Sequence, residues 1–412
     1  MTDYARWQSS ILKERLETRR VVMLTGARQC GKTTLARTLI AGSNVAYRTL
    51  DDAMTRQAAE SDPVLFADSV PKNGTLIIDE VQKVPELLPS IKLIVDKDNR
   101  PGQFLITGSA NILTLPTVTE SLAGRVARVR LRSLSQGEIA GTIPHFLEQA
   151  FMQKFNYPDT RYDRNDLIGM IFRGGFPEAV RLNAKDRQDW HSDYINALIE
   201  HDLSDVSNIR HKDIMRELVK VLAAWSSKFV EISSIGATLG ADRRTLANYL
   251  SILQSFYIAE SVPPWCKTDY DRIGRQEKFF MADTGMMAAV LGWQPSDTGS
   301  DSDKIGKAFE TFAYTELAAQ IDAAADNYTL YHYRDREKRE IDFLIEDGDG
   351  GILAIEVKSG VTVRKADFKH IEWFKDNLAK NKPVTGIVLY AGDTILPFGK
   401  DLWAVPFGCL WS

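Results

Sequence analysis

The order of apolar and polar positions divides the chain into a first part of strands and helices, a helical middle and a mixed final part. Residues 4–17 carry apolar side chains at helical spacing, and Val21–Leu24 follows as a run typical of a buried strand. Further runs of strand character occur at residues 44–50, 75–78, 103–106 and 126–131. This alternation predicts an α/β domain at the start of the chain.

The middle of the chain follows a helical period. Residues 185–225 show helical spacing of apolar side chains, and residues 232–250 predict two short helices joined by a glycine-containing turn. Beyond residue 303 the pattern is mixed again. Residues 307–320 predict a helix, whereas residues 339–345 and 352–358 have the composition of two strands.

The length of the chain bears on the number of domains. At 412 residues it is too long for one hydrophobic core. We predict three domains, at residues 1–140, 141–295 and 304–412, with a polar connection at 141–165 and a linker at 295–303. The net charge of −4 indicates no global basic surface, so a DNA-binding surface would have to be local.

Composition points to a soluble protein of a reducing compartment. Hydrophobic residues make up 44% and charged residues 26%, which is ordinary for a globular chain. Cys30, Cys266 and Cys409 are scattered without metal-binding spacing. The polar N-terminus and the lack of a long apolar run lead us to expect a cytoplasmic protein that has no membrane partner.

A phosphate-binding loop follows the first strand. Residues 26–33 have the spacing Gly-x-x-x-x-Gly-Lys-Thr, with a strand before and a helix after, which is the context that a P-loop requires. Backbone N–H groups of such a loop point at phosphate oxygens, Lys32 can reach the β- and γ-phosphates, and Thr33 can ligate Mg²⁺. The alternative is a glycine turn before a core helix. The predicted nucleotide contacts are Gly26, Ala27, Arg28, Gln29, Cys30, Gly31, Lys32, Thr33 and Thr34.

Two acids end the strand at residues 75–78. A buried strand followed by Asp79 and Glu80 is the Walker B pattern. This pattern is weak evidence by itself and strong evidence when a P-loop precedes it in the chain. Asp79 would hold Mg²⁺ directly or through water, and Glu80 would orient and deprotonate the attacking water. ATP and Mg²⁺ are therefore the predicted cofactors, and Glu80 and Lys32 the first catalytic candidates.

The next buried strand, at residues 103–106, ends in small polar residues. In P-loop ATPases with this layout, a polar side chain at that point sits between the Walker B acid and the γ-phosphate. Thr107 and Ser109 are both candidates for this role, and the alternative is an ordinary turn at the end of a strand.

Three segments together resemble a known family. Thr25–Thr34, Asp79–Pro85 and Leu122–Arg125 are similar to the corresponding motifs of bacterial and archaeal AAA+-type (AAA_14) P-loop ATPases that carry a DUF4143 C-terminal region. The resemblance covers nearly the whole chain and implies a five-strand parallel sheet with helices on both faces. Two further segments, 173–178 and 279–285, match the family without an assigned chemistry.

Arg125 occupies the place where AAA+ ATPases usually carry an arginine finger, just before the last strand of the sheet. Such a finger acts on the nucleotide of a neighbouring subunit, because an arginine neutralises transition-state charge only if assembly delivers it there. The resemblance therefore implies a homo-oligomer in which Arg125 is catalytic. The alternative is a surface arginine in a turn.

The two helices predicted within residues 232–250 have the form of a helix-turn-helix. Asp242 would cap the second helix, whose apolar side chains would face the core. Residues 256–259 suggest a winged extension. The side chains predicted to face outward, toward a DNA major groove, are Arg243, Arg244, Thr245 and Asn248. The alternative is a helical hairpin that contacts a protein.

The C-terminal part carries an acidic pattern of its own. Glu310 lies on an apolar helix stripe, Asp342 on the first strand, and Glu356 and Lys358 on one face of the second. This order is that of the PD-(D/E)xK nuclease fold. The carboxylates would ligate Mg²⁺ and Lys358 would position or activate water. The alternative is a surface hairpin with solvated charges, and cleavage itself stays open, since a fold does not imply an activity.

The sequence therefore favours an AAA+-type ATPase with a winged-helix middle region and a nuclease-like C-terminal domain. Its nucleotide state would be coupled to the binding or remodelling of DNA, including branched DNA. The alternative function is a STAND-like signalling switch that acts on a protein partner. The low positive charge favours the switch, whereas the complete set of Asp342, Glu356 and Lys358 favours DNA.

Overall fold

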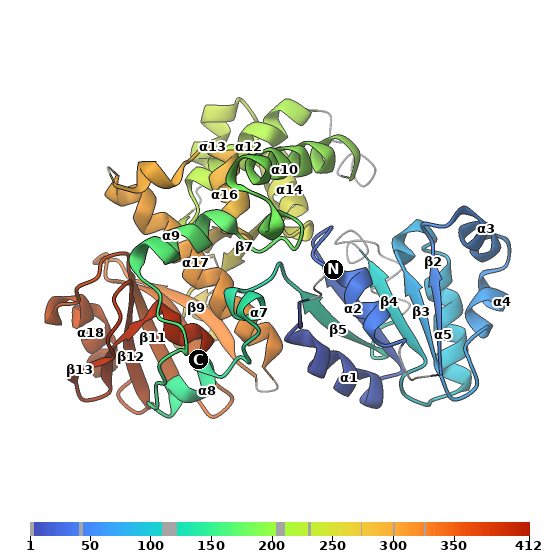
Figure 1. Ribbon diagram of the computed structural model, residues 1–412, viewed down its shortest axis with the longest axis horizontal. Helices are drawn as coiled ribbons and strands as arrows, with labels where there is room; N and C mark the ends of the chain where they lie inside the picture. Colours follow the sequence, from blue (N-terminus) through green and yellow to red (C-terminus); the bar gives the residue numbers. More distant parts are fainter. Residues whose placement is uncertain are drawn as a thin grey trace. The chain divides into compact units, whose positions relative to one another are not determined.

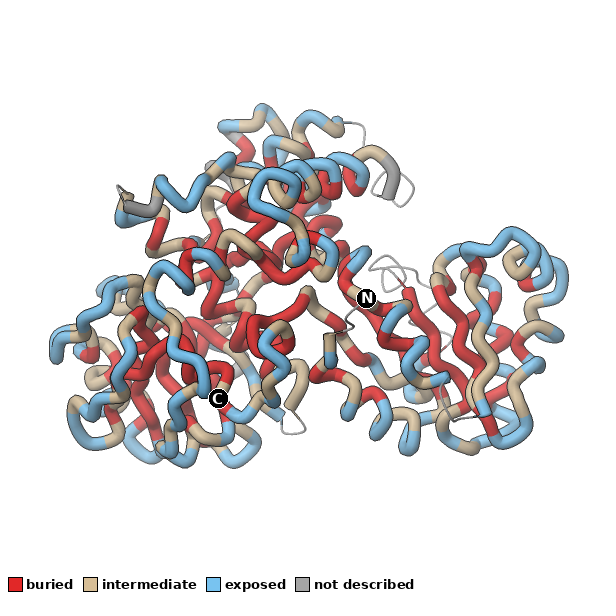
Figure 2. The backbone as a smooth tube through the Cα atoms, viewed as in Figure 1, coloured by how far each residue is buried: buried red, intermediate tan, exposed pale blue. Residues whose placement is uncertain are grey.

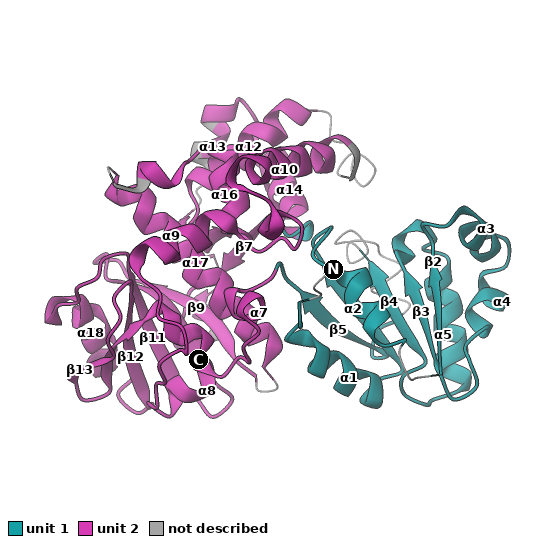
Figure 3. Ribbon diagram, viewed as in Figure 1, with its two compact units in different colours: residues 1–133, 255–258 teal, residues 134–254, 259–412 magenta. Residues whose placement is uncertain are grey.

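The computed structural model describes residues 4–40, 44–108, 122–202, 211–229, 232–272, 274–299, 301–324 and 327–412. The chain forms two compact units (Figure 3). Unit 1 comprises residues 1–133 with 255–258, and unit 2 comprises residues 134–254 with 259–412. The three predicted domain boundaries stay a prediction, because the two units follow contacts in space.

Unit 1 is built on a five-stranded parallel sheet with the order β2-β3-β4-β1-β5 (Figure 1). The predicted parallel sheet is thereby confirmed. Its strands are β1 (Val21–Gly26), β2 (Val45–Thr49), β3 (Thr75–Asp79), β4 (Phe104–Gly108) and β5 (Val126–Leu131).

Helices cover both faces of this sheet. They are α1 (Gln8–Thr18), α2 (Lys32–Thr38), α3 (Ala53–Ser61), α4 (Pro63–Asp68) and α5 (Leu87–Lys97). Apolar side chains of α3, α4 and α5 share one core with alternate strand residues such as Met23, Ile78 and Ile106. Helices α1 and α2 contact β1, and Val22 and Leu24, on the opposite face of that strand, are fully buried.

The parallel register places the ends of β1, β3 and β4 beside one another. Phe104 of β4 pairs with Val21 of β1 on one side and with Leu76 of β3 on the other. Because parallel strands end at the same edge, the residues that follow all three strands gather at the carboxyl edge of the sheet.

Unit 2 begins with a helical region. Its helices up to the C-terminal part are α7 (Gln136–Ala140), α8 (Phe146–Phe151), α9 (Arg164–Arg173), α10 (Ala184–Ala197), α12 (Lys212–Ala224), α13 (Ile232–Leu239), α14 (Arg243–Ser255), α15 (Asp269–Arg272) and α16 (Thr284–Val290). The predicted connection at 141–165 therefore contains a helix of its own.

A small antiparallel sheet accompanies α13 and α14. Its strands are β6 (Lys228–Phe229), β7 (Ala259–Val262) and β8 (Lys278–Met281), in the order β6-β8-β7. Strand β6 precedes the two helices and the other two strands follow them. The helices and strands expected of a winged helix are thus present in chain order, and the assignment itself stays a prediction.

The C-terminal part holds a six-stranded mixed sheet in the order β13-β14-β12-β11-β10-β9. Its elements are α17 (Ser302–Ala323), β9 (Thr329–Arg334), β10 (Glu340–Glu346), β11 (Ile352–Lys358), α18 (Lys369–Asn377), β12 (Val384–Tyr390), β13 (Leu396–Gly399) and β14 (Leu402–Pro406). Helix α18 packs on the face that carries Ile341, Leu344 and Ala354, and α17 contacts β11. The buried strands of both large sheets stand out in Figure 2.

Candidate functional site

Both glycines of the loop between β1 and α2 are required by the backbone. Gly26 has a φ of 157°, and a Cβ there would lie 2.1 Å from the carbonyl oxygen of Leu131. Gly31 has a φ of 103°, which is strained for any residue with a side chain. The sequence spacing thus matches a backbone that only glycine tolerates at these two points.

Lys32 lies within the curve of the loop. Its buried Nζ donates to the carbonyl oxygens of Gly26 at 3.1 Å and Ala27 at 2.8 Å. Arg6, which sequence reasoning missed, stabilises the same loop through hydrogen bonds to backbone carbonyl oxygens. It donates from Nη1 to Cys30 O at 2.7 Å and from Nη2 to Arg132 O at 2.7 Å. No motif marks Arg6, because its two partners lie 24 and 126 residues further along the chain.

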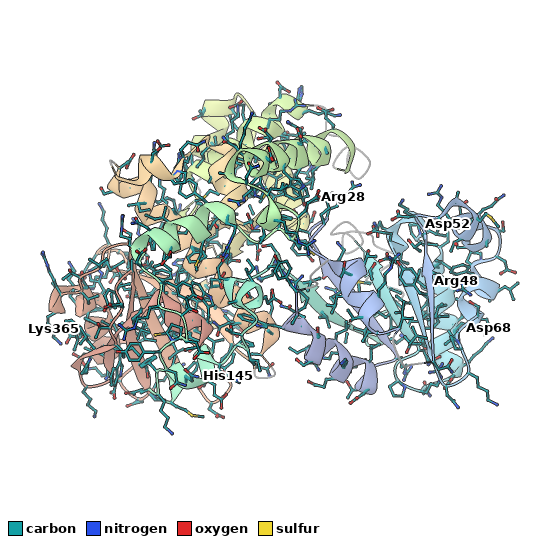
Figure 4. The ribbon with its side chains drawn as sticks, in the orientation of Figure 1. Arg28, Arg48, Asp52, Asp68, His145 and Lys365 are labelled. Carbon is teal, nitrogen blue, oxygen red and sulfur yellow. The ribbon has the colours of Figure 1, made fainter. Side chains whose placement is uncertain are left out.

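The remaining loop residues differ in exposure. Arg28, Gln29 and Thr34 are exposed, and Arg28 is among the side chains labelled in Figure 4. Cys30 is buried and its Sγ donates to Leu131 O at 3.4 Å. Cys30 therefore contributes its backbone to the loop while its side chain packs inward.

Asp79 joins the loop to the neighbouring strands. Its Oδ2 accepts from Thr33 Oγ1 at 2.9 Å and from the hydroxyl of Tyr47 at 2.8 Å, and its Oδ1 accepts from Thr107 Oγ1. The carboxylate is 1% exposed. A carboxylate and a hydroxyl oxygen side by side form a hard-oxygen donor set, so Asp79 and Thr33 fit Mg²⁺.

Tyr47 is the second residue that the sequence did not reveal. Burial and the hydrogen bond to Asp79 raise the pKa of its phenol, so that it stays a hydrogen-bond donor. The Arg37 guanidinium lies over its ring at 5.0 Å from the centroid. Strand β2 was predicted, but which of its side chains reaches Asp79 depends on the pairing of β2 with β3.

Glu80 is held in a strained conformation. Its φ of 61° is left-handed, which is unusual for a residue with a side chain. Its N–H donates to Thr107 Oγ1 at 3.1 Å, and Gln82 Nε2 donates to its carboxylate. Thr107, fully buried, thus contacts Asp79 and Glu80 together. Ser109, the other polar candidate, lies outside the described residues.

Arg125 lies away from the loop of its own chain. Strand β5 pairs in parallel with β1, with Val126 opposite Val21 and Leu131 opposite Gly26. Arg125 therefore precedes the amino edge of the sheet, roughly 17 Å from the loop at about 3.3 Å per residue. Its Nε and Nη2 donate to the two oxygens of Asp96 at 2.5 and 3.0 Å.

In the segment predicted to be a helix-turn-helix, three of the four side chains predicted to face outward are exposed. Arg244 N and Thr245 N donate to Asp242 Oδ1 at 2.9 and 3.0 Å, which confirms Asp242 as the cap of α14. The side chains of Leu246, Leu250 and Leu253 are buried, those of Arg243, Arg244 and Asn248 are exposed, and that of Thr245 is half-buried. The exposed face of α14 is therefore available for contact.

The two family-like segments without assigned chemistry contact one another. Asp283 accepts from Gly175 N at 2.8 Å and caps α16 by accepting from Met286 N at 2.8 Å. A Cβ at Gly174 would lie 2.4 Å from Asp283 Oδ1, and one at Gly285 would lie 2.9 Å from Arg173 O. The glycines are needed for close approach, so these segments serve the packing of α9 against α16.

The acidic residues of the C-terminal part gather around a lysine. Lys278 Nζ of β8 lies 2.8 Å from Glu340 Oε1 and 3.2 Å from Asp342 Oδ1, and it forms an ion pair with Glu310. Lys358 Nζ pairs with Glu356 Oε1 at 2.8 Å. Sequence reasoning missed Lys278, although a lysine that opens an apolar strand was a detectable signal.

Burial and mutual repulsion shape the acidities of this group. Burial and then the charge of Asp342 raise the pKa of Glu310 and of Glu356 to about 8 each. Burial lowers the pKa of Lys278, but the charges of Glu310, Asp342 and Glu340 outweigh it and raise that pKa well above the ordinary value. In the described residues, no group of three or more His, Cys, Asp or Glu side chains is arranged to hold a metal ion.

A pocket of about 810 Å³ opens on unit 2 beside β9 and the end of α18. Half of the residues that line it are aromatic or cationic: Trp265, Tyr270, Tyr331, Lys267, Arg272, Lys380 and Lys382. Tyr270 is 87% exposed. The Arg272 guanidinium lies 4.6 Å from the centre of the Tyr331 ring, and Lys382 pairs with Glu346 at 2.6 Å. Flat rings beside cations suit an anionic partner with planar groups.

Three family models match successive parts of the chain. Residues 18–140 match the model described as AAA domain, residues 164–297 match a domain of unknown function, DUF8612, and residues 305–410 match another, DUF4143. Together with the loop, the Walker B strand and the parallel sheet, the first match supports a P-loop ATPase domain at residues 18–140.

Curated relatives extend over most of the chain. Uncharacterized proteins of Mycobacterium tuberculosis and Mycobacterium bovis are each 28% identical over 337 residues, which cover 81% of this chain and 69% of the relative. An uncharacterized protein of Haemophilus influenzae is 20% identical over 382 residues, with 87% of this chain and 88% of the relative covered.

Similar solved structures include two archaeal ATPases. A Walker-type ATPase of Pyrococcus abyssi has a TM-score of 0.43 at 15% identity, covering 69% of this chain and 94% of its own. A signal transduction ATPase with numerous domains (STAND) from Pyrococcus horikoshii has a TM-score of 0.20 at 12% identity, covering 75% and 47%. These scores are too low to define a common overall fold.

The helices that the structure describes include none with the length and apolar character needed to cross a lipid bilayer.

Proposed function

We propose that this protein binds and hydrolyses ATP, with the site at the carboxyl edge of the parallel sheet. The observation that carries the proposal is the linkage of three motifs through one carboxylate. Asp79 contacts Thr33 of the loop and Thr107 of β4, and the lysine of the loop lies close by in sequence. These are the groups that phosphoryl transfer requires, since catalysis there is mostly positioning and charge stabilisation.

Each residue has a distinct role in this proposal. Lys32 balances the charge of the β- and γ-phosphates, and Gly26 and Gly31 let the backbone approach them. Asp79 and Thr33 would hold Mg²⁺, which neutralises phosphate charge when bound. Glu80 takes the proton of the attacking water, and Thr107 fixes the backbone of Glu80 so that its carboxylate keeps one direction.

The direct test is a phosphate-release assay on the purified full chain. ATP hydrolysis should require a divalent cation, and EDTA should reduce it to background, because Mg²⁺ both holds the phosphates and neutralises their charge. A fluorescent ATP analogue should bind in the same protein and be displaced by ATP and ADP. Failure to bind any nucleotide in the presence of Mg²⁺ would refute the proposal.

The proposal includes an assembly in which Arg125 acts on the nucleotide of a neighbouring subunit. The support is geometric, since Arg125 lies at the edge of the sheet opposite its own loop and is partly exposed. From this position the guanidinium of Arg125 cannot reach the phosphates of a nucleotide bound by the same chain. The ion pair between Arg125 and Asp96 would have to break when the subunits assemble.

Replacing Arg125 with Ala should leave ATP affinity nearly intact and lower turnover about 100-fold, the typical loss for one charge-stabilising donor. Mixtures of Arg125→Ala and Lys32→Ala subunits should regain activity, because one subunit supplies the finger and the other the nucleotide. Asp96→Ala is the matched control, since it frees Arg125 without removing it, and it should keep full turnover. A monomer in light scattering with full activity would exclude the assembly.

We further propose that nucleotide state is coupled to DNA binding through unit 2. The support is the capped helix α14 with Arg243, Arg244 and Asn248 exposed on one side. A second support is the pocket lined by Tyr270 and by cations, because bases stack on aromatic rings and phosphates attract lysines. Branched or partly single-stranded DNA presents duplex and unstacked bases together and is the preferred substrate in this proposal.

Replacing Arg243 and Arg244 together with Glu should weaken DNA binding at least tenfold at low salt and flatten its salt dependence by about two phosphate contacts. Fluorescence anisotropy on duplex, single-stranded and junction DNA across a salt series measures both effects. Lys154→Glu with Arg161→Glu is the matched control, because both residues are exposed in unit 2 outside α13 and α14. If both double variants bound DNA with equal affinity, α14 would not contact DNA, and the alternative role of contacting a protein would be favoured.

The second candidate function is an ATP-dependent signalling switch with a protein partner. The observation that favours it is the net charge of −4, which opposes non-specific attraction to DNA. The salt series separates the two functions, since a switch without a DNA partner would bind none of the three DNA forms in any nucleotide state.

A further inference from the structure

The ammonium of Lys278 contacts two of the three carboxylates that the sequence assigned to magnesium, Glu310 and Asp342. Its Nζ forms ion pairs with Glu310, Glu340 and Asp342, and it donates hydrogen bonds to Glu340 and Asp342. The Lys278 side chain is 1% exposed, against 15% for Glu310 and 13% for Asp342. The lysine is therefore the innermost member of the group.

Two other oxygens of the group are also engaged. Glu356 pairs with Lys358 at 2.8 Å, and the second oxygen of Asp342 accepts from Val357 N at 2.9 Å. Mg²⁺ needs near-octahedral oxygens at about 2.1 Å. Glu310 Oε1 and Asp342 Oδ1, which would have to ligate such an ion, already contact the ammonium of Lys278. The residues present therefore do not fit a metal while Lys278 keeps its place.

The backbone holds Lys278 in this position from both sides. Strand β8 is the central strand of its sheet, and Lys278 pairs with Phe229 of β6 and with Val262 of β7. The Phe229 ring also lies 5.9 Å from Nζ. Withdrawal of the ammonium would leave the partly buried carboxylates of Glu310 and Asp342 without this cation, which is unfavourable. The contact is therefore a lasting part of unit 2.

We propose that Lys278 is a built-in substitute for the divalent cation, so that the carboxylates of Glu310, Glu340 and Asp342 hold strand β8 and exclude metal. In this proposal the C-terminal part serves as a binding and anchoring module and does not catalyse metal-dependent cleavage. This goes beyond the proposed ATPase, which it neither requires nor affects. Removal of the lysine side chain would turn the same carboxylates into a site for Mn²⁺ or Mg²⁺.

The test measures Mn²⁺ binding by electron paramagnetic resonance on the full chain without nucleotide. Mn²⁺ can also bind at Asp79 and the P-loop. We therefore count only the Mn²⁺ binding that is lost when Asp342→Asn is added. The wild-type protein should show none. Lys278→Met should show Mn²⁺ binding that the further change Asp342→Asn removes, and its melting temperature should rise with Mn²⁺ because the ion binds only the folded state.

Two further variants keep the result decisive. Lys358→Met is the matched control, because it removes the other lysine but leaves the ammonium of Lys278 in place, and it should gain no Mn²⁺ binding. Lys278→Met with Glu310→Gln removes one charge of each sign and should fold and bind Mn²⁺ even if the single variant fails to fold. Mn²⁺ binding by wild type that Asp342→Asn abolishes would overturn the proposal, as would the absence of binding in both Lys278 variants.

Discussion

Replacement of Glu80 with Gln should yield a protein that binds ATP normally and hydrolyses it about 1000-fold more slowly. A neutral amide keeps the shape of the side chain and can still hydrogen-bond, but it cannot take the proton of the attacking water. The left-handed backbone of Glu80 and its N–H bond to Thr107 do not depend on the carboxylate. The defect should therefore appear in turnover and leave affinity unchanged.

The measurement pairs single-turnover hydrolysis with equilibrium binding of ATP. Glu86→Gln is the matched control, since it makes the same chemical change at an exposed position six residues further along the chain. It should hydrolyse ATP at the wild-type rate. Hydrolysis by Glu80→Gln at the wild-type rate would show that another group accepts the proton.

Replacement of Lys32 with Ala should abolish detectable nucleotide binding. An ammonium that bonds to two phosphates contributes charge-assisted hydrogen bonds of about 1.5–3 kcal/mol each, so its loss corresponds to about 1000-fold in affinity. The loop itself should survive, because its shape rests on Gly26 and Gly31 and on the bond from Arg6 to Cys30.

Isothermal titration with ATP and with ADP checks this result. Lys32→Met retains the aliphatic stem and separates the loss of charge from the loss of packing, and it should fail to bind as well. Lys83→Ala is the control, because Lys83 is an exposed lysine of unit 1 that pairs with Asp51. Wild-type affinity in Lys32→Met would mean that the ammonium does not face the phosphates.

Local sequence determined the elements of the ATPase site, because a short run of residues sufficed to specify each of them. The spacing of Gly26, Gly31 and Lys32 is set by what a backbone needs to wrap a phosphate. The strand that ends in Asp79 and Glu80 and the strand that ends in Thr107 could be recognised in the same way. Likewise, Asp242 predicted where α14 begins, because an N-cap contacts residues that are its near neighbours in the chain.

Only the tertiary structure decided which distant side chains complete these sites. Tyr47 reaches Asp79 because β2 pairs with β3, and Arg6 reaches the loop across more than twenty residues of chain. The largest effect is that of Lys278, which comes from a strand more than thirty residues before Glu310. A pattern of acids predicts that they gather, but the cation that balances their charge is chosen by packing, and here packing places an ammonium among them.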